Sequence, residues 1–457
     1  MFDSDPILSI SPLTGRYQEK LLSLQNYFSE MALMRYRIAV EVEWIIHLCN
    51  TLKLAETQIL EKKEINFLKS LYIDFTLDDA HRIKEIEQET NHDVKAVEYF
   101  IREKIEHSKW SKLKKLESFI HFACTSEDIN NMAYGLSIKD FLDDEYIPLI
   151  EMLMSQLSLM SKKYKSIAML GHTHGQSAVS TTVGKELWNF CYRIEQQLQK
   201  LKKIEIFGKF NGAVGNYNAH VVAYPEIDWL KTTRDFIEQF GLTQNPITTQ
   251  IEPHDNLAEI FDIIRRLNTI ILDFNRDMWT YISMGYFKQK TKKGEVGSST
   301  MPHKVNPIDF ENSEGNLGIA NALLSHFSEK LPVSRLQRDL SDSTVLRNIG
   351  SAFGYSALAY LSVIRGLKKV EVNEEKIDSE LEKNYAMLAE AIQTILRKQG
   401  KKDAYERLKE FSRGKKVTKD SMQNFIKSLK LEAKDEKMLL NLTPKSYIGL
   451  AEKLTKF

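Results

Sequence analysis

Cysteine is scarce in this sequence. The 457 residues include three cysteines, Cys49, Cys124 and Cys191, and they are widely scattered along the chain. Their number and spacing exclude both a disulfide framework and a metal knuckle built from neighbouring thiols. We therefore expect free, buried thiols in a reducing compartment.

Long hydrophobic runs are also missing. No uncharged apolar segment is long enough to span a bilayer, which excludes a helical membrane protein. The first residues, Met1–Pro6, are acidic where a secretory signal peptide would be basic. The sequence thus predicts a cytoplasmic protein with no membrane partner.

Neither sign of charge is in excess. Lysine and arginine total 63, aspartate and glutamate total 62, and the net charge is +1. A balanced chain has no general electrostatic attraction for nucleic acid. The basic stretch from Arg397 to Lys419 is a possible local exception, but Asp403, Glu406 and Glu410 interrupt it, so a solvated helix face is favoured. We expect no nucleic-acid partner.

Glycine and proline are absent from long stretches. Residues 16–134 contain neither, and residues 333–443 contain no proline, whereas short strands joined by tight turns need both. Apolar residues recur every three or four positions in the segments 150–164, 183–201 and 257–278. These patterns predict a predominantly helical chain with a bundle of long helices.

The chain is too long for one compact core. Its composition changes at the basic run Lys112–Lys115 and again near Gly366–Val370, where the long-helix pattern ends. We therefore expect two or three domains, and both composition changes taken as boundaries give three. They are an N-terminal helical domain at 1–112, a central helix-bundle domain at 113–367 and a C-terminal helical domain at 368–457.

The segment with the densest chemistry is Gly-Ser-Ser-Thr-Met-Pro-His-Lys-Val-Asn-Pro at positions 297–307. Its glycine and the nearby Gly294 free the backbone, whereas its two prolines stiffen the part that follows the serines. Lys304 and Asn306 supply a cation and a carboxamide next to the serine hydroxyls. The loop is predicted to be a lid that binds an anion and moves a proton. A plain surface loop rich in serine and glycine is the alternative.

Two histidines lie in Gly171–Gln176, at the junction between two of the predicted long helices. At such a junction His172 or His174 can point into a cleft. A His-x-His pair can also bind a metal, but no cysteine or Glu-x-x-His pattern accompanies it. We therefore predict acid–base chemistry here and no metal.

Three further segments are rich in polar side chains. Thr125–Asn131 carries hydroxyls, carboxylates and amides, and a helix N-cap explains it equally well. Asn91–Lys95 places an imidazole beside a carboxylate, although a solvated helical turn is an alternative. Three arginines flank Ser341–Thr344, which suits bidentate capture of phosphate or carboxylate, or else a salt-bridged surface.

The loop at 297–307 resembles the signature of the fumarase/aspartase superfamily, Gly-Ser-Ser-x-Met-Pro-x-Lys-x-Asn-Pro, with every fixed position filled. The superfamily also includes fumarase, aspartase and argininosuccinate lyase. Thr125–Asp128, Thr173–Gln176 and Arg338–Arg347 resemble the versions found in the adenylosuccinate lyase family, in its longer bacterial form. The resemblance extends over essentially the whole chain.

The resemblance implies an all-α, three-domain fumarase/aspartase-like fold whose bundle assembles with three copies into a homotetramer with shared active sites. It implies no cofactor. The implied reaction is elimination of fumarate from two small-molecule nucleotides: adenylosuccinate, which gives AMP, and succinylaminoimidazole carboxamide ribotide (SAICAR), which gives AICAR. The alternatives are another fumarate-releasing lyase, such as argininosuccinate lyase, and a catalytically silent helical scaffold.

The resemblance also implies a role for each residue of the site. Ser298 would be the general base, His174 the general acid on the leaving nitrogen, and Glu311 the residue that orients it. Lys304 and Asn306 would stabilise the doubly charged aci-carboxylate. The substrate would be bound by Arg16, Tyr17, Asn91, His92, Asp93, Thr125, Ser126, Gln250, Ser299, Lys304, Val305, Asn306, Asn312, Arg338, Ser343, Thr344, Val345, Leu346 and Arg347.

Overall fold

A computed structural model describes residues 5–290, 301, 304–401, 403–414 and 416–455. The chain divides into two compact units. The first unit consists of Met1–Leu149, Gln197–Thr269 and Asn316–Ala359, and the second of Ile150–Gln196, Ile270–Gly315 and Tyr360–Phe457. The limits of the units fall inside the longest helices. The three predicted domains therefore stay a prediction.

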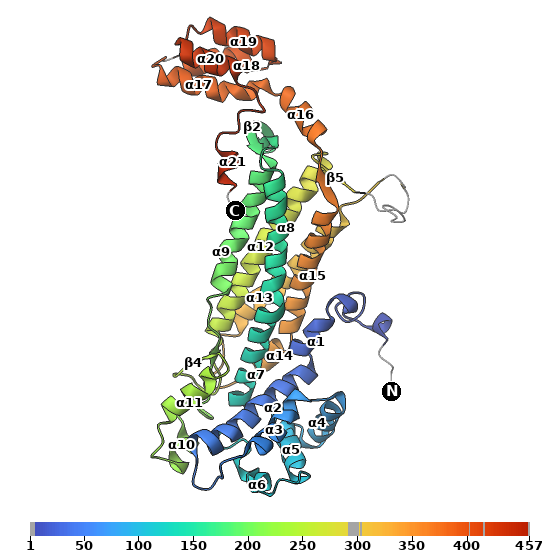
Figure 1. The fold of residues 1–457 in the computed structure, drawn as a ribbon, viewed down its shortest axis with the longest axis vertical. Helices are drawn as coiled ribbons and strands as arrows, with labels where there is room; N and C mark the ends of the chain where they lie inside the picture. The colour runs from blue at the N-terminus through green and yellow to red at the C-terminus, as the bar shows by residue number, and fades with distance from the viewer. Residues whose placement is uncertain (1–4, 291–300, 302–303, 402, 415, 456–457) are drawn as a thin grey trace. The chain divides into compact units, whose positions relative to one another are not determined.

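Short and medium helices build most of the first unit (Figure 1). They are α1 (Gln25–Phe28), α2 (Glu30–Ile46), α3 (Lys62–Ile73), α4 (Leu77–Thr90), α5 (Asp93–Glu106), α6 (Ser111–Lys114), α7 (Ser126–Phe141), α10 (Asn218–Ala223), α11 (Trp229–Glu238) and α14 (Ser341–Leu346). Trp44 of α2 is fully buried, and its ring centroid lies 4.6 Å from that of Phe210 and 4.9 Å from that of Phe236. Aromatic packing of this kind anchors the core of the unit.

Five long helices match the predicted bundle. They are α8 (Ile147–Lys163), α9 (Val183–Leu201), α12 (Asp255–Ser283), α13 (Ile308–Lys330) and α15 (Ile349–Lys368). The apolar stripes predicted on α9 and α12 are buried along their full length. Within the second unit, α9 packs on α12 through the rings of Phe190 and Phe274, 5.3 Å apart, and Asn275 of α12 donates to Ser313 of α13 at 2.8 Å. The prediction of a long-helix bundle is confirmed.

The described residues also include three two-stranded sheets that the helix periodicity did not predict. These are the hairpin β1 (Ala168–Thr173) and β2 (Gln176–Thr182), the parallel pair β3 (Phe207–Gly208) and β4 (Thr243–Gln244), and the antiparallel pair β5 (Phe287–Gln289) and β6 (Val370–Val372). β2 is rich in β-branched residues, which favour a strand over a helix. The fold is therefore mostly, but not purely, helical.

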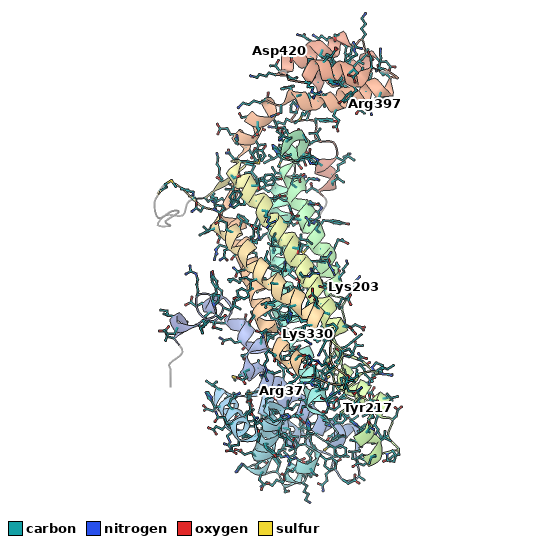
Figure 2. The ribbon with its side chains drawn as sticks, turned by 180° about the vertical axis from the view of Figure 1, so that it is seen from behind. Arg37, Lys203, Tyr217, Lys330, Arg397 and Asp420 are labelled. Atoms are coloured by element: carbon teal, nitrogen blue, oxygen red, sulfur yellow. The ribbon has the colours of Figure 1, made fainter. Side chains whose placement is uncertain are left out.

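A helical cluster lies near the C-terminal end of the chain, within the second unit. It contains α17 (Ala389–Lys398), α18 (Ala404–Ser412), α19 (Lys419–Ser428) and α20 (Ala433–Asn441). The preceding α16 (Glu374–Glu382) packs on β1, and the following α21 (Ala451–Leu454) packs on β2. Apolar side chains of α17 and α19, such as Ile392 and Ile426, share one core. Figure 2 labels the exposed side chains of Arg397 on α17 and Asp420 on α19. Lys409 of α18 lies 3.6 Å from Glu406, as a solvated helix face predicts.

Two of the three cysteine thiols are buried as predicted, and the third is not. Cys49 and Cys191 are buried, Cys124 is half-buried, and all three are free. In the described part of the chain, no helix has the length and apolar character required to cross a membrane.

Candidate active site

A cavity of about 420 Å³ lies in the first unit, and we call it the main cavity. Its volume is in the range of small-molecule sites. The lining residues that the sequence predicted are Asn91, His92, Asp93, Thr125, Ser126, Gln250, Arg338, Ser343, Thr344 and Arg347. Four segments that are far apart along the chain thus meet around one space.

The break between α4 and α5 forms one wall. Asn91 ends α4 with a φ of 53°, in the left-handed region that asparagine tolerates. His92 caps α5, because its Nδ1 accepts a hydrogen bond from the backbone N–H of Lys95 at 3.1 Å. With Nδ1 acting as the acceptor, the neutral ring carries its proton on Nε2. The segment is a break between helices rather than a solvated helical turn, and it leaves Nε2 to donate to a ligand.

The start of α7 forms a second wall. Thr125 is the N-cap in a capping box with Asp128, and its backbone N–H donates to Asp128 Oδ2 at 2.8 Å. Thr125 and Ser126 also line the main cavity. The two sequence interpretations of this segment, a helix cap and a ligand-binding turn, are therefore compatible in one structure.

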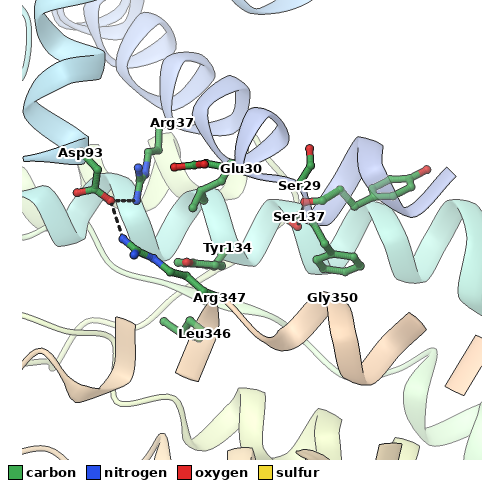
Figure 3. A pocket seen from close by; sticks show the side chains of 12 residues that line it. Ser29, Glu30, Arg37, Asp93, Tyr134, Ser137, Leu346, Arg347 and Gly350 are labelled. Carbon is green, nitrogen blue, oxygen red and sulfur yellow. Dashed lines mark hydrogen bonds and ion pairs between the residues drawn. The ribbon is translucent and has the colours of Figure 1, made fainter. Parts of the chain in front are cut away.

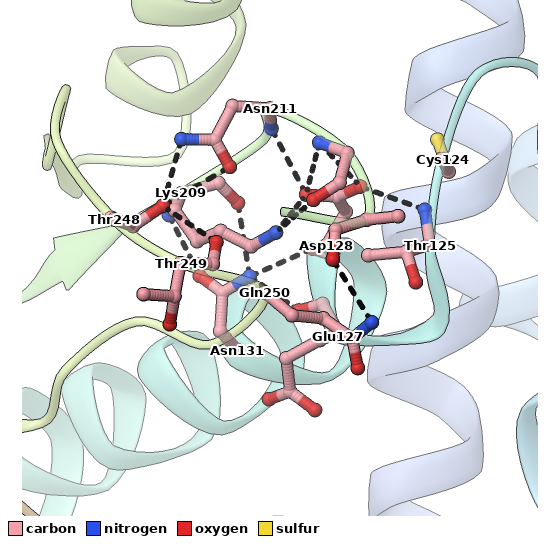
Figure 4. A network of polar contacts seen from close by, with 12 residues as sticks. Cys124, Thr125, Glu127, Asp128, Asn131, Lys209, Asn211, Thr248, Thr249 and Gln250 are labelled. Carbon is pink, nitrogen blue, oxygen red and sulfur yellow. Dashed lines mark hydrogen bonds and ion pairs between the residues drawn. The ribbon is translucent and has the colours of Figure 1, made fainter. Parts of the chain in front are cut away.

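A buried polar network supports this wall (Figure 4). Lys209 Nζ lies 2.7 Å from Asp128 Oδ1, and both side chains are fully buried. Asp128 Oδ1 also accepts from the backbone N–H of Asn211 at 3.0 Å. Farther along this loop, the carbonyl of Ala213 accepts from Gln250 Nε2 at 3.0 Å. One buried carboxylate thus connects the start of α7 to the loop that holds Gln250.

Arg338 is held by buried carboxyl groups. Its Nη1 donates to Glu127 Oε2 at 2.8 Å and to Asp342 Oδ2 at 3.2 Å, and its Nη2 donates to Ser343 Oγ at 3.3 Å. Burial raises the pKa of Glu127 despite the nearby Arg338. Burial also acts to raise the pKa of Asp342, but the nearby His254, whose Nε2 lies 3.6 Å from Oδ2, and the charge of Arg338 lower it overall. Arg338 is thus fixed at the cavity wall by ion pairs with both carboxyl groups.

Arg347 is more exposed than Arg338. Its side chain is 62% exposed, and its Nη2 donates to Asp93 Oδ2 at 3.3 Å. The same oxygen accepts from Nη2 of the buried Arg37 at 2.8 Å. A second cavity, of about 270 Å³, shares Arg37, Asp93, Tyr134 and Arg347 with the main cavity (Figure 3). The aspartate therefore lies where the two cavities adjoin.

Other predicted binding residues of the first unit lie elsewhere. Leu346 is buried and lines the second cavity, and Val345 is half-buried in α14 outside the lining of the main cavity. Arg16 is exposed, with its guanidinium carbon 5.9 Å from the ring centroid of Tyr17. Tyr17 packs against a core cluster that contains Leu21. Neither Arg16 nor Tyr17 lines the main cavity.

His174 lies at the tip of the β1–β2 hairpin, in the second unit. Thr173 pairs with Gln176, so His174 and Gly175 form a two-residue loop, with φ values of 53° and 72°. Positive φ at both positions is typical of a type I′ turn, which explains the glycine. The side chain of His174 is exposed.

Glu311 lies in the first turn of α13, also in the second unit. Its Oε1 accepts from Trp279 Nε1 at 3.0 Å. Among the described residues of one chain, His174 and Glu311 form no hydrogen bond with each other. Asn312, the next residue, accepts through Oδ1 from Ser362 Oγ at 2.8 Å.

Part of the signature loop can be described. Lys304 is exposed and Asn306 is half-buried. The carbonyl of Val305 accepts from Gln289 Nε2 at 2.8 Å, which ties the end of the loop to β5. Ser298 and Ser299 lie outside the described residues.

Sequence reasoning missed several residues of the main cavity. These are Arg37, Glu87, Val94, Asn130, Tyr134 and Leu340. Val94, Asn130 and Leu340 lie inside segments that the sequence singled out, although no binding role was predicted for them. Arg37 lies within the regular helix α2, where no local motif marks it.

Metal binding has no support in the described residues. They contain no group of three or more histidine, cysteine, aspartate or glutamate side chains placed to hold a metal ion.

Comparisons with known proteins identify the family of the chain. Residues 15–321 match the family described as "Lyase", and residues 334–448 match "Adenylosuccinate lyase C-terminal". Adenylosuccinate lyase from Buchnera aphidicola is 52% identical over 98% of both chains, and that from Escherichia coli K12 is 49% identical over 97% of both. The chain belongs to the adenylosuccinate lyase family.

Solved structures support the fold of this adenylosuccinate lyase family member. A 3-carboxy-cis,cis-muconate lactonizing enzyme from Pseudomonas putida has a TM-score of 0.73 at 19% identity, over 95% of both chains. A fumarate lyase from Mesorhizobium sp. BNC1 has a TM-score of 0.73 at 14% identity, over 95% of this chain and 96% of that one. The predicted fumarase/aspartase-like fold is thereby confirmed.

Proposed function

We propose that this chain is a carbon–nitrogen lyase that eliminates fumarate from adenylosuccinate, giving AMP, and from SAICAR, giving AICAR. The observation that carries the proposal is the main cavity, where Arg338 and Arg347 lie with His92 and the hydroxyls of Thr125 and Ser126. Guanidinium forks suit a phosphate, and hydroxyls and imidazole suit a ribose or base. Argininosuccinate has no phosphate, so a phosphate site favours a nucleotide over that alternative.

In this proposal Ser298 removes a proton beside a substrate carboxylate. The resulting carbanion is delocalised into the carboxylate as a doubly charged aci-form, so it needs fixed cations and donors. Lys304 provides the charge and Asn306 the carboxamide. These interactions strengthen as charge develops, so they lower the barrier more than they tighten substrate binding.

His174 donates a proton to the leaving nitrogen in this proposal, and Glu311 orients the imidazole. A histidine suits the task because its ordinary pKa lies near neutral pH. His174 is exposed at the tip of a hairpin, and Glu311 accepts a hydrogen bond from Trp279 of its own chain. These observations are compatible with a catalytic pair completed by a neighbouring subunit.

We propose accordingly a homotetramer whose active sites are shared between subunits, located in the cytoplasm and working without a cofactor. The three domains, 1–112, 113–367 and 368–457, and the substrate contacts of Arg16, Tyr17 and Ser299 belong to the same proposal. Support comes from the family and from the long helices α12 and α13, whose length allows lateral packing of several copies.

The purified chain should convert adenylosuccinate and SAICAR with a measurable change in ultraviolet absorbance and release fumarate from each. Argininosuccinate serves as the control substrate and should not react. Turnover of argininosuccinate, or no turnover of either nucleotide, would overturn the proposal.

A further inference from the structure

Arg37 is a buried arginine that lies outside every sequence motif. It belongs to α2 and is 4% exposed. Its Nε donates to Asn130 Oδ1 of α7 at 2.8 Å, and its Nη2 donates to Asp93 Oδ2 of α5 at 2.8 Å. One guanidinium thus connects three helices at the wall of the main cavity.

Asp93 is shared between two arginines (Figure 3). Its Oδ2 accepts from Arg37 at 2.8 Å and from Arg347 at 3.3 Å. Burial acts to raise the pKa of Asp93, but the charge and hydrogen bond of Arg37, the N–H of Val94 and the charge of Arg347 lower it overall. Asp93 is therefore ionised at neutral pH, and this cluster of two arginines and one aspartate carries a net positive charge.

We propose that Arg37 is a positioning residue for substrate binding, because it holds the Asp93 carboxylate in place and thereby orients Arg347 toward the phosphate of the nucleotide. This inference rests on the proposed function. Arg37 itself donates to Asp93 and Asn130, so the more exposed Arg347 is the arginine that remains available to a ligand.

The physical reason is that Asp93 and the substrate phosphate compete for the N–H groups of the Arg347 guanidinium. Arginine and carboxylate prefer a bidentate pair, in which two N–H groups face two oxygens. The contact with Arg37 keeps Asp93 Oδ2 engaged, so Arg347 makes one N–H contact with it at 3.3 Å. Without Arg37, Asp93 is free to turn and occupy both N–H groups of Arg347. The anion would then lose its partner, although Arg347 itself is unchanged.

The test substitutes Arg37→Met and measures AMP affinity by equilibrium binding, together with KM and kcat for adenylosuccinate. We expect the Kd for AMP and the KM to rise about tenfold, as the loss of one charge-assisted contact predicts, with kcat close to that of the parent. Arg37→Lys should weaken binding similarly, since one ammonium nitrogen cannot replace two separated donors. If Arg37→Met does not fold, Arg37→Lys alone provides the test.

Arg35→Met is the matched control. Arg35 lies in the same helix, donates to the backbone carbonyl of Asn26 at 2.7 Å, and does not line either cavity. Its loss should leave the Kd for AMP unchanged.

Combining Arg37→Met with Asp93→Asn distinguishes a positioning role of Arg37 from a general contribution to folding. In Asp93→Asn protein the carboxylate charge is gone, so adding Arg37→Met should have little further effect on AMP affinity. A full tenfold loss in that background, or unchanged AMP affinity in folded Arg37→Met or Arg37→Lys, would overturn the inference. Failure of the parent to bind AMP and to cleave adenylosuccinate would instead overturn the proposed function.

Discussion

Lys209 and Asp128 form an ion pair that is sealed from solvent. Nζ lies 2.7 Å from Oδ1, and neither side chain has exposed surface. Lys209 Nζ also donates to the carbonyl of Gly212 at 3.0 Å, and Asp128 accepts from the backbone N–H groups of Thr125 and Asn211. Both charges thus have several hydrogen-bond partners, which is the condition under which a buried pair is tolerated.

Replacing Lys209 with methionine should lower the free energy of unfolding by about 3–5 kcal/mol, because Asp128 would remain buried without its counter-charge. Chemical denaturation followed by circular dichroism measures the change. Lys231→Met is the control: Lys231 Nζ lies 2.5 Å from Asp235 Oδ2, but both side chains are exposed and screened by water, so we expect a far smaller loss of stability. Equal losses in the two variants would contradict the importance assigned to the buried pair.

Arg347→Lys should weaken nucleotide binding by about 1–3 kcal/mol, because a planar fork becomes a single point of contact. Isothermal titration with AMP measures the effect. Arg335→Lys is the matched control, since Arg335 is 84% exposed, lies 3.6 Å from Asp339 and does not line the main cavity. Binding as tight as in the parent would place Arg347 in a surface network instead.

Ser298→Ala should lower kcat by at least about 10²-fold and leave substrate binding nearly intact, because a base that acts in the transition state contributes little to ground-state affinity. Single-turnover kinetics and equilibrium binding separate the two effects. Ser428→Ala, a change at an exposed serine of α19, is the control and should have full activity. Near-normal turnover of Ser298→Ala would end the assignment of Ser298 as the base.

Mixing His174→Ala protein with Ser298→Ala protein should restore activity under conditions that allow subunits to exchange. We assume that each site takes its histidine from one subunit and its serine from another. In a random equal mixture the histidine of a site is unmutated with a chance of about one half, and so is the serine, so about a quarter of the sites have both residues. Mass-tagged hybrids verify the exchange. No recovery after verified exchange would mean that both residues of a site belong to one chain.

The bundle was predictable because helix periodicity is a local property. Ile260, Ile264, Leu267 and Ile271 repeat every three or four residues, and all four are buried on one face of α12. The β1–β2 hairpin was not predicted, because the stripes on either side of it suggested only a junction between helices. The β-branched residues of β2 were the local signal for it.

The types of residue in the site could be predicted from the sequence, but their arrangement in space could not. The hydroxyls at Thr125 and Ser126 and the arginines at 338 and 347 were recognisable from their types and spacing alone. Their meeting at one cavity with His92 was not, because no residue-to-residue spacing along the chain encodes it. The expectation that these residues bind one substrate came from the resemblance to a family and not from spacing along the chain.

By itself, the sequence determined the helical class, the long bundle helices, the family and most of the polar residues around the main cavity, since these depend on residue types and on neighbours a few positions apart. Tertiary structure alone decided that Arg37 reaches Asp93 and that Arg347, 254 positions farther along the chain, contacts the same oxygen. It also decided that Lys209 neutralises Asp128 inside the core. Such contacts depend on how whole helices and loops pack, and each buried charge leaves no local pattern that identifies its partner.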